Sequence, residues 1–132
     1  MIGRWVVHNG DKTITMKVLP VANANFMMMQ LWKNGIKEEP DEMQLIGWSF
    51  KTRDIVSWHF GLDGGFAFGH WQRTASNWSI STKGTRRDGA DTFATYHIDR
   101  IDNDHFKWSS VARQAGDDRL PDMQAVVAVR EN

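Results

Sequence analysis

Turn-forming residues recur along this chain at short and even intervals, and this spacing constrains the fold more than any other feature. The turn signals, rich in Gly, Asn, Asp and Ser, lie at residues 9–11, 34–35, 51–54, 63–65, 75–77, 87–89 and 102–104. Turns spaced about 8–12 residues apart are typical of an antiparallel all-β meander. A helical protein is excluded, because apolar residues never keep a helical spacing for three turns and Gly or Asx interrupts every window of about 12 residues.

The segments between the turns are rich in β-branched and aromatic residues and are predicted to be about ten strands. They span about 4–8, 12–19, 25–33, 43–50, 54–61, 65–73, 77–84, 91–101, 105–113 and 123–130. An open sheet of so many short strands would expose long edges, and closure into a barrel removes them. The sequence therefore predicts an up-and-down β-barrel, with a two-sheet sandwich as the alternative.

Length and charge restrict the class of protein. With 132 residues the chain is predicted to form one domain, 1–132. Sixteen basic residues balance sixteen acidic ones, so neither nucleic acid nor an anionic membrane is an expected partner. The absence of cysteine excludes disulfides and thiolate metal sites. No signal peptide or membrane-length apolar run is recognisable, so a soluble, cytoplasmic protein is the default expectation.

The hairpin over residues 54–73 suggests a small internal pocket. If its turn pairs Phe60 with Phe66, one face carries mostly small or polar residues, whereas a one-residue slip would redistribute them. The residues predicted to contact a ligand from that face are Ser57, His59, Ala67, Gly69 and Trp71, beside Ile55. The alternative is that the glycines of this hairpin serve only backbone geometry. Likewise, the seven Trp, seven Phe and seven Met residues either line a ligand cavity or simply fill a small barrel.

The segment Phe26–Trp32 carries apolar residues on both faces of the predicted strand, whereas a barrel strand should alternate between apolar and polar residues. No helix is available to cover a second apolar face, so the sequence predicts a homodimer interface over Met27, Met29 and Leu31. The alternative is a register shift or bulge within the strand.

The five histidines are candidate metal ligands or bases. None is spaced as in a known metal motif, so no metal and no cofactor are predicted. His97 and Asp99 share a strand face. In one interpretation the Asp99 carboxylate orients the His97 imidazole for proton transfer, and in the other the two side chains form a solvated pair. Ser57 and His59 also share a face, but no nucleophile elbow or oxyanion-hole signature accompanies them. The candidate catalytic residues are therefore His59, His97 and Asp99.

Several short motifs carry a resemblance to a known family. They are Met1–Trp5, Ile46–Trp48, Ile55–Trp58, Gly64–Phe66, Gly69–Trp71, Asp88–Gly89, Asp104–Trp108 and Leu120–Asp122. Taken together, over essentially the whole chain, they resemble a bacterial β-domain that often follows a SnoaL-like domain in uncharacterised, frequently planctomycete, proteins. The Gly-x-Trp of the first strand is also similar to that of lipocalin-like domains of unknown function.

The resemblance implies a lipocalin-like, or calycin-like, barrel with no established activity. The chain departs from the family pattern in lacking the SnoaL-like domain and in carrying His59, His70 and His97 at positions where mostly non-ionisable residues are expected. The function predicted first is binding of a small apolar or amphipathic molecule inside the barrel. The alternatives are an enzyme using His-based acid–base chemistry in the same cavity, and a filled barrel with a structural or dimerisation role.

Overall fold

The computed structural model describes residues 1–131 and contains strands and turns, with no helix in that range. The strands are β1 (Gly3–Asn9), β2 (Lys12–Val21), β3 (Phe26–Lys33), β4 (Glu42–Ser49), β5 (Asp54–Gly61), β6 (Phe66–Thr74), β7 (Asn77–Thr85), β8 (Asp91–Asp102), β9 (His105–Ala115), β10 (Asp118–Arg119) and β11 (Met123–Glu131). The predicted strands agree with these to within about two residues, and only the two-residue β10 is absent from the prediction.

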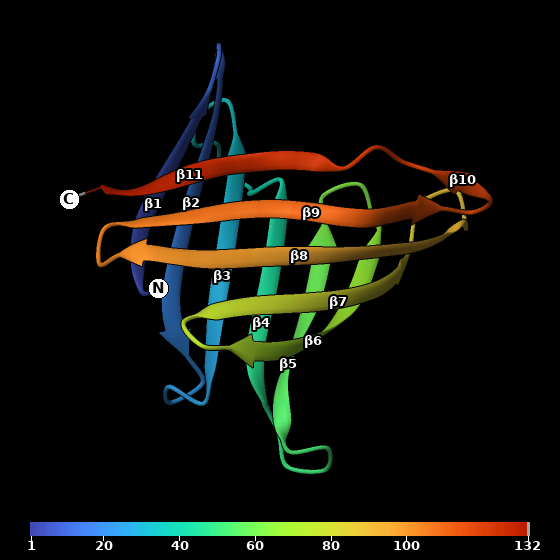
Figure 1. Cartoon of the computed structure of the whole chain (residues 1–132), viewed down its shortest axis with the longest axis horizontal. Coiled ribbons are helices and arrows are strands. Elements are labelled where there is room, and N and C mark those ends of the chain that lie inside the picture. Colours follow the sequence, from blue (N-terminus) through green and yellow to red (C-terminus); the bar gives the residue numbers. More distant parts are fainter. Residues whose placement is uncertain (132) are drawn as a thin grey trace.

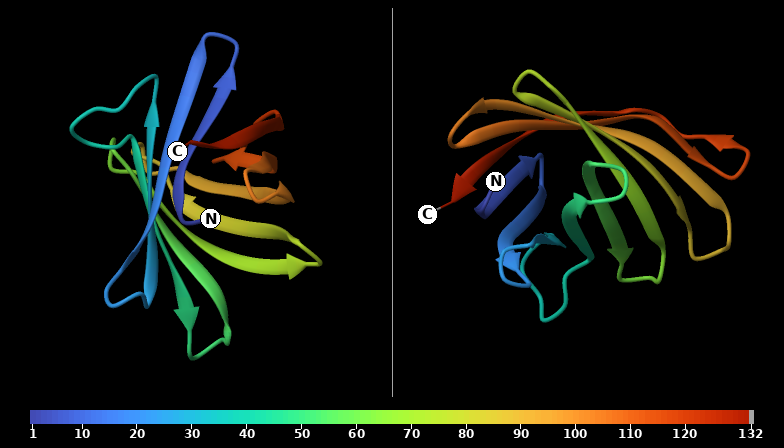
Figure 2. Two further views of the ribbon diagram at one scale, coloured as in Figure 1. Left: turned by 90° about the vertical axis from the view of Figure 1, so that its left-hand side faces the viewer. Right: turned by 90° about the horizontal axis from the view of Figure 1, so that it is seen from below.

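The strands close into an antiparallel barrel. Each strand from β1 to β9 pairs with its neighbours in the chain, β9 pairs with β11, and β11 pairs with β1. β10 adds a short pairing to the end of β9. In Figures 1 and 2, β7, β8, β9 and β11 cross steeply over β1 to β5, and β6 bends from one group to the other. The predicted lipocalin-like, up-and-down barrel is confirmed, and the sandwich alternative is wrong.

Tight turns determine which side chains point inward. At the β5–β6 turn Gly64 has φ 97°, which an L residue adopts only with strain, and the turn pairs Phe60 with Phe66 as predicted. This register places Ser57 opposite Gly69. Because side chains alternate along a strand, the pairing turns Ser57 and Trp71 inward and Trp58 and Phe68 outward.

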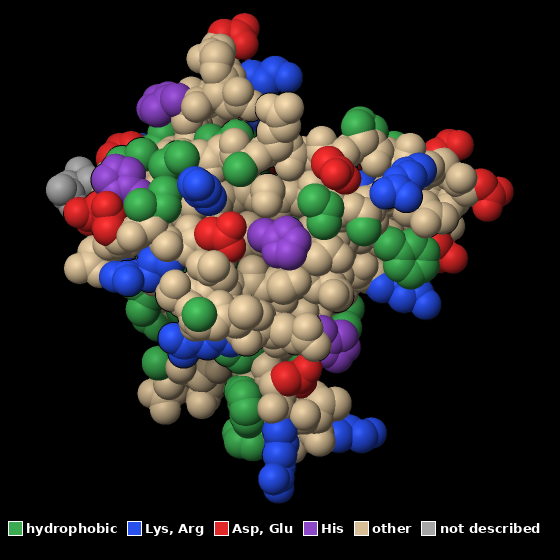
Figure 3. Space-filling view, viewed as in Figure 1, with side chains coloured by type: hydrophobic (Ala, Val, Ile, Leu, Met, Phe, Trp, Pro, Cys, Tyr) green, Lys and Arg blue, Asp and Glu red, His purple; other side chains and the backbone are tan. Residues whose placement is uncertain are grey.

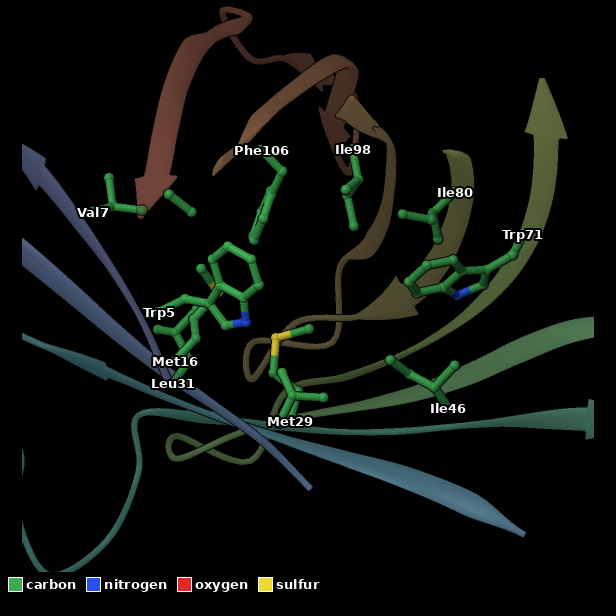
Figure 4. Close-up of a cluster of buried hydrophobic side chains, with 12 residues drawn as sticks. Trp5, Val7, Met16, Met29, Leu31, Ile46, Trp71, Ile80, Ile98 and Phe106 are labelled. Atoms are coloured by element: carbon green, nitrogen blue, oxygen red, sulfur yellow. The ribbon is translucent and has the colours of Figure 1, made fainter. Parts of the chain in front are cut away.

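The barrel interior holds the main hydrophobic core. Figure 4 shows side chains of β1 to β4 pointing toward those of β6 to β9. The buried cluster consists of Trp5, Val7, Met16, Val18, Met29, Leu31, Ile46, Trp71, Ile80, Ile98, Phe106 and Ala128. Each strand from β1 to β4 contributes to this cluster. The alternate, apolar residues of these strands therefore form the inner wall of the barrel.

Strand β3 corrects the predicted dimer interface. Met29 and Leu31 are buried in the core cluster, and Met27 packs against it, so these residues face the barrel interior rather than a partner chain. On the outer face, Trp32 is only 4% exposed, because its indole N–H donates to the carbonyl of Lys37 at 3.0 Å in the following loop. The loop after β3 therefore covers Trp32, whereas Phe26, Met28 and Gln30 on the same face are half-buried. The predicted homodimer itself stays a prediction.

The outer surface is mixed in charge. On the face shown in Figure 3, acidic and basic side chains are interspersed. Aromatic residues on the outer face of the β5–β6 hairpin remain exposed, among them Phe60 at 46% and Phe66 at 58%. Among residues 1–131 there is no helix long and apolar enough to cross a membrane.

Candidate functional site

The barrel encloses a cavity of about 230 Å³. Its walls come from most of the strands: Met1, Ile14, Met16, Met29, Leu31, Lys33, Glu42, Gln44, His59, Trp71, Ile80, Tyr96, Ile98, Phe106, Trp108, Arg113 and Met123. Most of the wall is apolar, with methionine, isoleucine and aromatic side chains. Such a surface suits an apolar molecule, and the few polar groups among it would orient one.

Two of the charged side chains of the cavity come from the ends of strands. Lys33 ends β3 and Glu42 begins β4, and their side chains form an ion pair at 3.5 Å. Both side chains are about half exposed, so the pair stands at the rim and contributes little to stability. One end of the apolar cavity is therefore charged and open to solvent.

Arg113 reaches the cavity because of a β-bulge. The register between β8 and β9 shifts between Phe93 and Thr95, and on the β9 side Ala112 has φ 52°. The extra residue reverses the inward and outward parity of β9. Phe106 and Trp108 line the cavity before the bulge and Arg113 lines it afterwards. Strict alternation from Phe106 would have pointed Arg113 outward.

At the cavity wall, two hydrogen bonds join three polar side chains into a network. The Trp71 indole N–H donates to Ser57 Oγ at 2.9 Å, and Ser57 Oγ lies 2.7 Å from His59 Nε2. Since Ser57 Oγ already accepts from Trp71, its own hydroxyl hydrogen satisfies the network by donating to His59 Nε2. This assignment leaves the proton of the neutral imidazole on Nδ1.

His59 is kept neutral by its surroundings. Burial lowers the pKa of His59 from 6.5 to about 4, because the charged imidazolium would lose its hydration inside the barrel. At neutral pH the ring therefore presents one donor, Nδ1–H, besides the nitrogen that Ser57 occupies. At neutral pH His59 is therefore a hydrogen-bonding group rather than a cation.

Tyr96 is also uncharged at neutral pH. Burial raises the pKa of its phenol, the negative charge of Glu42 raises it further, and Arg113 opposes both. On the neighbouring strand, the hydroxyl of Ser110 faces Tyr96 in the register and is buried without a hydrogen-bond partner among residues 1–131. The cavity wall thus combines neutral donors with the charges of its rim.

The residues predicted to contact a ligand are placed at different depths. His59 and Trp71 line the cavity. Ser57 is fully buried behind them and does not line it. Ala67 lies in a shallow hollow beside His59, at the same end of the barrel.

Gly69 leaves room for the polar network rather than for a ligand. A Cβ atom at this position would lie 2.6 Å from Ser57 Oγ and 3.2 Å from His59 Nε2. Any larger residue would displace the Ser57–His59 contact, so a leucine here would disrupt the wall instead of occupying the cavity. The expectation that Gly69 borders a ligand-sized space is wrong.

His97 and Asp99 lie outside the cavity. Ile98, between them, is buried and lines the cavity, so the alternation of β8 turns both neighbours to the outer face. His97 is paired in the register with Ser79 and Ser109. The prediction that His97 acts as a base within the cavity is therefore wrong, and of the three candidate catalytic residues only His59 reaches it.

Sequence reasoning missed most of the polar cavity residues. The missed residues are Lys33, Glu42, Gln44, Tyr96 and Arg113. The parity of Glu42 and Gln44 with the buried Ile46 is visible in the sequence, whereas Arg113 depends on the bulge. Within the part of the chain that the structure describes, no group of three or more His, Asp or Glu side chains is arranged to hold a metal ion.

Comparisons with known proteins add no assignment. A scan against protein-family models finds no match, and a search of curated proteins finds none either. The resemblance to the β-domain that follows SnoaL-like domains stays a prediction, and function has to be argued from the geometry of the barrel.

Proposed function

We propose that this protein binds a small, mainly apolar molecule inside its barrel. The observation that carries the proposal is the cavity of about 230 Å³, which is lined mostly by apolar side chains and has polar groups gathered at one end. A filled barrel with a structural role would pack its interior with side chains at the density of a protein core. The space beside Met29 and Trp71 favours a ligand-holding barrel over a filled one.

The size of the cavity limits the ligand. A cavity of about 150 Å³ accommodates benzene, so by proportion this one suits a molecule of about ten non-hydrogen atoms. The neutral Nδ1–H of His59 and the hydroxyl of Tyr96 supply donors for one or two acceptor atoms on such a molecule. A short amphipathic molecule with a hydroxyl or carbonyl end fits this combination.

The chemistry of His59 favours binding over catalysis. A general base working near neutral pH is most effective with a pKa near 7, whereas the pKa of His59 is lowered to about 4. The hydroxyl of Ser57 has no exposed surface and accepts the Trp71 indole N–H, so it is not accessible as a nucleophile. These contacts stabilise the wall, and we assign them a positioning role.

The proposal is tested with 1-octanol as the probe and a matched pair of variants. Met28 and Met29 are adjacent, but Met29 lines the cavity and Met28 faces outward. We expect saturable binding of 1-octanol in calorimetry, weakened about tenfold or more by Met29→Trp, which fills the space, and unchanged by Met28→Trp.

A second measurement covers the case in which Met29→Trp does not fold. In the unaltered protein, 1-octanol should shift the NMR signal of the indole N–H of Trp71, because this side chain lines the cavity. The corresponding signal of Trp32 should not change, because that side chain faces the loop after β3. Absence of saturable binding, or equal binding by both tryptophan variants, would overturn the proposal.

A further inference from the structure

A second hollow, of about 470 Å³, opens at the other end of the barrel. In Figure 1, β6, β8 and β11 all run toward the left side of the barrel, where the chain also begins. Met1, Ile98 and Phe106 line both this hollow and the ligand cavity, so the two spaces share part of their walls. The other residues that line the hollow do not line the cavity.

Arginines occupy the last inward positions of the three strands that meet at this hollow. Arg73 follows the inward Trp71 on β6, Arg100 follows Ile98 on β8, and Arg130 follows Ala128 on β11, each by two residues. All three line the hollow. Side chains two residues apart share a face, so the end of the interior surface carries a group of guanidinium ions.

Two of these arginines have no carboxylate partner. Arg130 lies 3.4 Å from Asp104 and donates to the carbonyls of Ile2 and Asn103, so it ties the ends of the chain together. Arg73 donates to the carbonyl of Ala75, and Arg100 to the side-chain amide oxygen of Asn103. Neither forms an ion pair with a carboxylate among residues 1–131.

Acidic groups do not balance this charge. Asp102 is the one carboxylate among the residues that line the hollow, and it lies 2.8 Å from His105 Nδ1. The pKa of Asp102 is lowered, first by its hydrogen bond with His105, so it remains ionised. The hollow therefore keeps an excess of positive charge from Arg73 and Arg100.

Aromatic and apolar residues make up most of the remaining wall, together with Ser76, Asn103 and His105. Trp5 and Trp78 line the hollow together with Ile98 and Phe106. The guanidinium of Arg130 lies 4.4 Å from the centre of the Trp5 ring, and that of Arg73 lies 5.9 Å from the centre of the Trp78 ring. Stacking on indole holds each guanidinium in place while its N–H edge stays available for hydrogen bonds.

We infer that this hollow is a binding site for a small organic anion. A phosphate or carboxylate group would lie between Arg73 and Arg100, whose planar guanidinium ions suit paired hydrogen bonds to such groups. The apolar part of the ligand would pack on Trp78 and Phe106. The proposed anion contacts differ from those of the ligand cavity, because Arg73 and Arg100 do not line the cavity and no residue of the polar network around His59 lines the hollow.

Phenyl phosphate tests the site, with phenol and inorganic phosphate as comparison probes. Phenyl phosphate should bind more tightly than either comparison probe, since each of them lacks one of the two recognised parts. Arg73→Gln and Arg100→Gln should each weaken phenyl phosphate binding about tenfold. Arg87→Gln, which changes an exposed arginine at the opposite end of the barrel, should leave the affinity unchanged.

Two further measurements separate this inference from the proposal for the cavity. Phenyl phosphate binding should survive Met29→Trp, and it should shift the indole signals of Trp5 and Trp78 but not that of Trp32. Binding should also weaken with salt, as expected for an anion on exposed guanidinium groups. Undiminished affinity in the Arg73→Gln, Arg100→Gln double variant, loss of affinity in Met29→Trp, or no binding by the unaltered protein would overturn the inference.

Discussion

At the residue scale, His59 shows how the barrel controls the charge of a single side chain. Its Nε2 is occupied by the Ser57 hydroxyl, and its ring is largely removed from water. The neutral state of the ring follows from burial, which disfavours the imidazolium. Gly69 makes this arrangement sterically feasible, because any Cβ there would contact both members of the pair.

The lowered pKa of His59 predicts a loss of stability in mild acid. In the unfolded chain the imidazole takes up a proton as the pH falls through 6.5, whereas in the folded barrel it does so only near pH 4. The unfolded state therefore binds more protons between these values, and the free energy of unfolding should fall as the pH is lowered from 6.5 to 4, by at most about 3 kcal/mol. Urea denaturation at several pH values measures this loss.

A matched pair of variants isolates the contribution of His59. His59→Gln keeps a polar atom near Ser57 but does not titrate, so the loss of stability between pH 6.5 and 4 should be smaller than in the unaltered protein. His8→Gln, at an exposed position, should leave the pH dependence as it was. An identical pH dependence in all three proteins would show that His59 is not the group responsible.

At the element scale, β3 and β9 show two ways in which a strand departs from simple alternation. In β3 both faces carry apolar residues: one faces the core, and on the other the loop after the strand covers Trp32. In β9 the bulge at Ala112 brings residues of opposite parity to the same inner face. The first departure extends the buried apolar surface, and the second places a cation at the cavity.

The backbone at the bulge predicts an unusual response to glycine. Ala112 has φ 52°, a left-handed conformation that costs an L residue about 1–2 kcal/mol and glycine very little. Ala112→Gly should therefore raise the free energy of unfolding by about 0.5–1 kcal/mol. Ala67→Gly, in the regular register of β6 with His59 and Gly84, should lower it by a similar amount. Chemical denaturation measures both, and destabilisation by both changes would contradict the assigned bulge.

At the scale of the whole molecule, closure of the barrel means that the chain could begin at a different turn and still form the same strand pairings. Each strand from β1 to β9 lies beside its neighbours in sequence, and β11 closes the ring between β9 and β1. The ring is completed where β1 meets β11, with Arg4 opposite Glu131. The two ends of the chain therefore lie side by side, and a short linker is long enough to join them.

Circular permutation tests this closure. A chain that begins at Gly64, with a Gly–Ser linker from the original C-terminus to Met1, should keep the strand-rich circular dichroism spectrum and cooperative unfolding, because only the exposed β5–β6 turn is cut. A permutant opened between His70 and Trp71 interrupts β6 and should lose cooperative unfolding. Failure of the first permutant, or equal stability of both, would contradict a ring closed through β1 and β11.

Local chemistry in the sequence determined the strands and their order. Turn residues such as Asp63–Gly65 act over a few residues, so they predicted the hairpins and even the pairing of Phe60 with Phe66. Alternation then indicated that His59 and Trp71 face inward. These features depend on neighbours in the chain, which a single sequence displays.

Only the tertiary structure decided which faces meet across the barrel. The bulge that turns Arg113 inward leaves no distinctive residue in the sequence, since Ala112 is an ordinary strand residue in a left-handed conformation. The burial of Met29 and the outward direction of His97 follow from which side of each strand the closed ring encloses. Arg73, Arg100 and Arg130 are far apart in the chain, and they gather at one hollow because three strands end at the same rim.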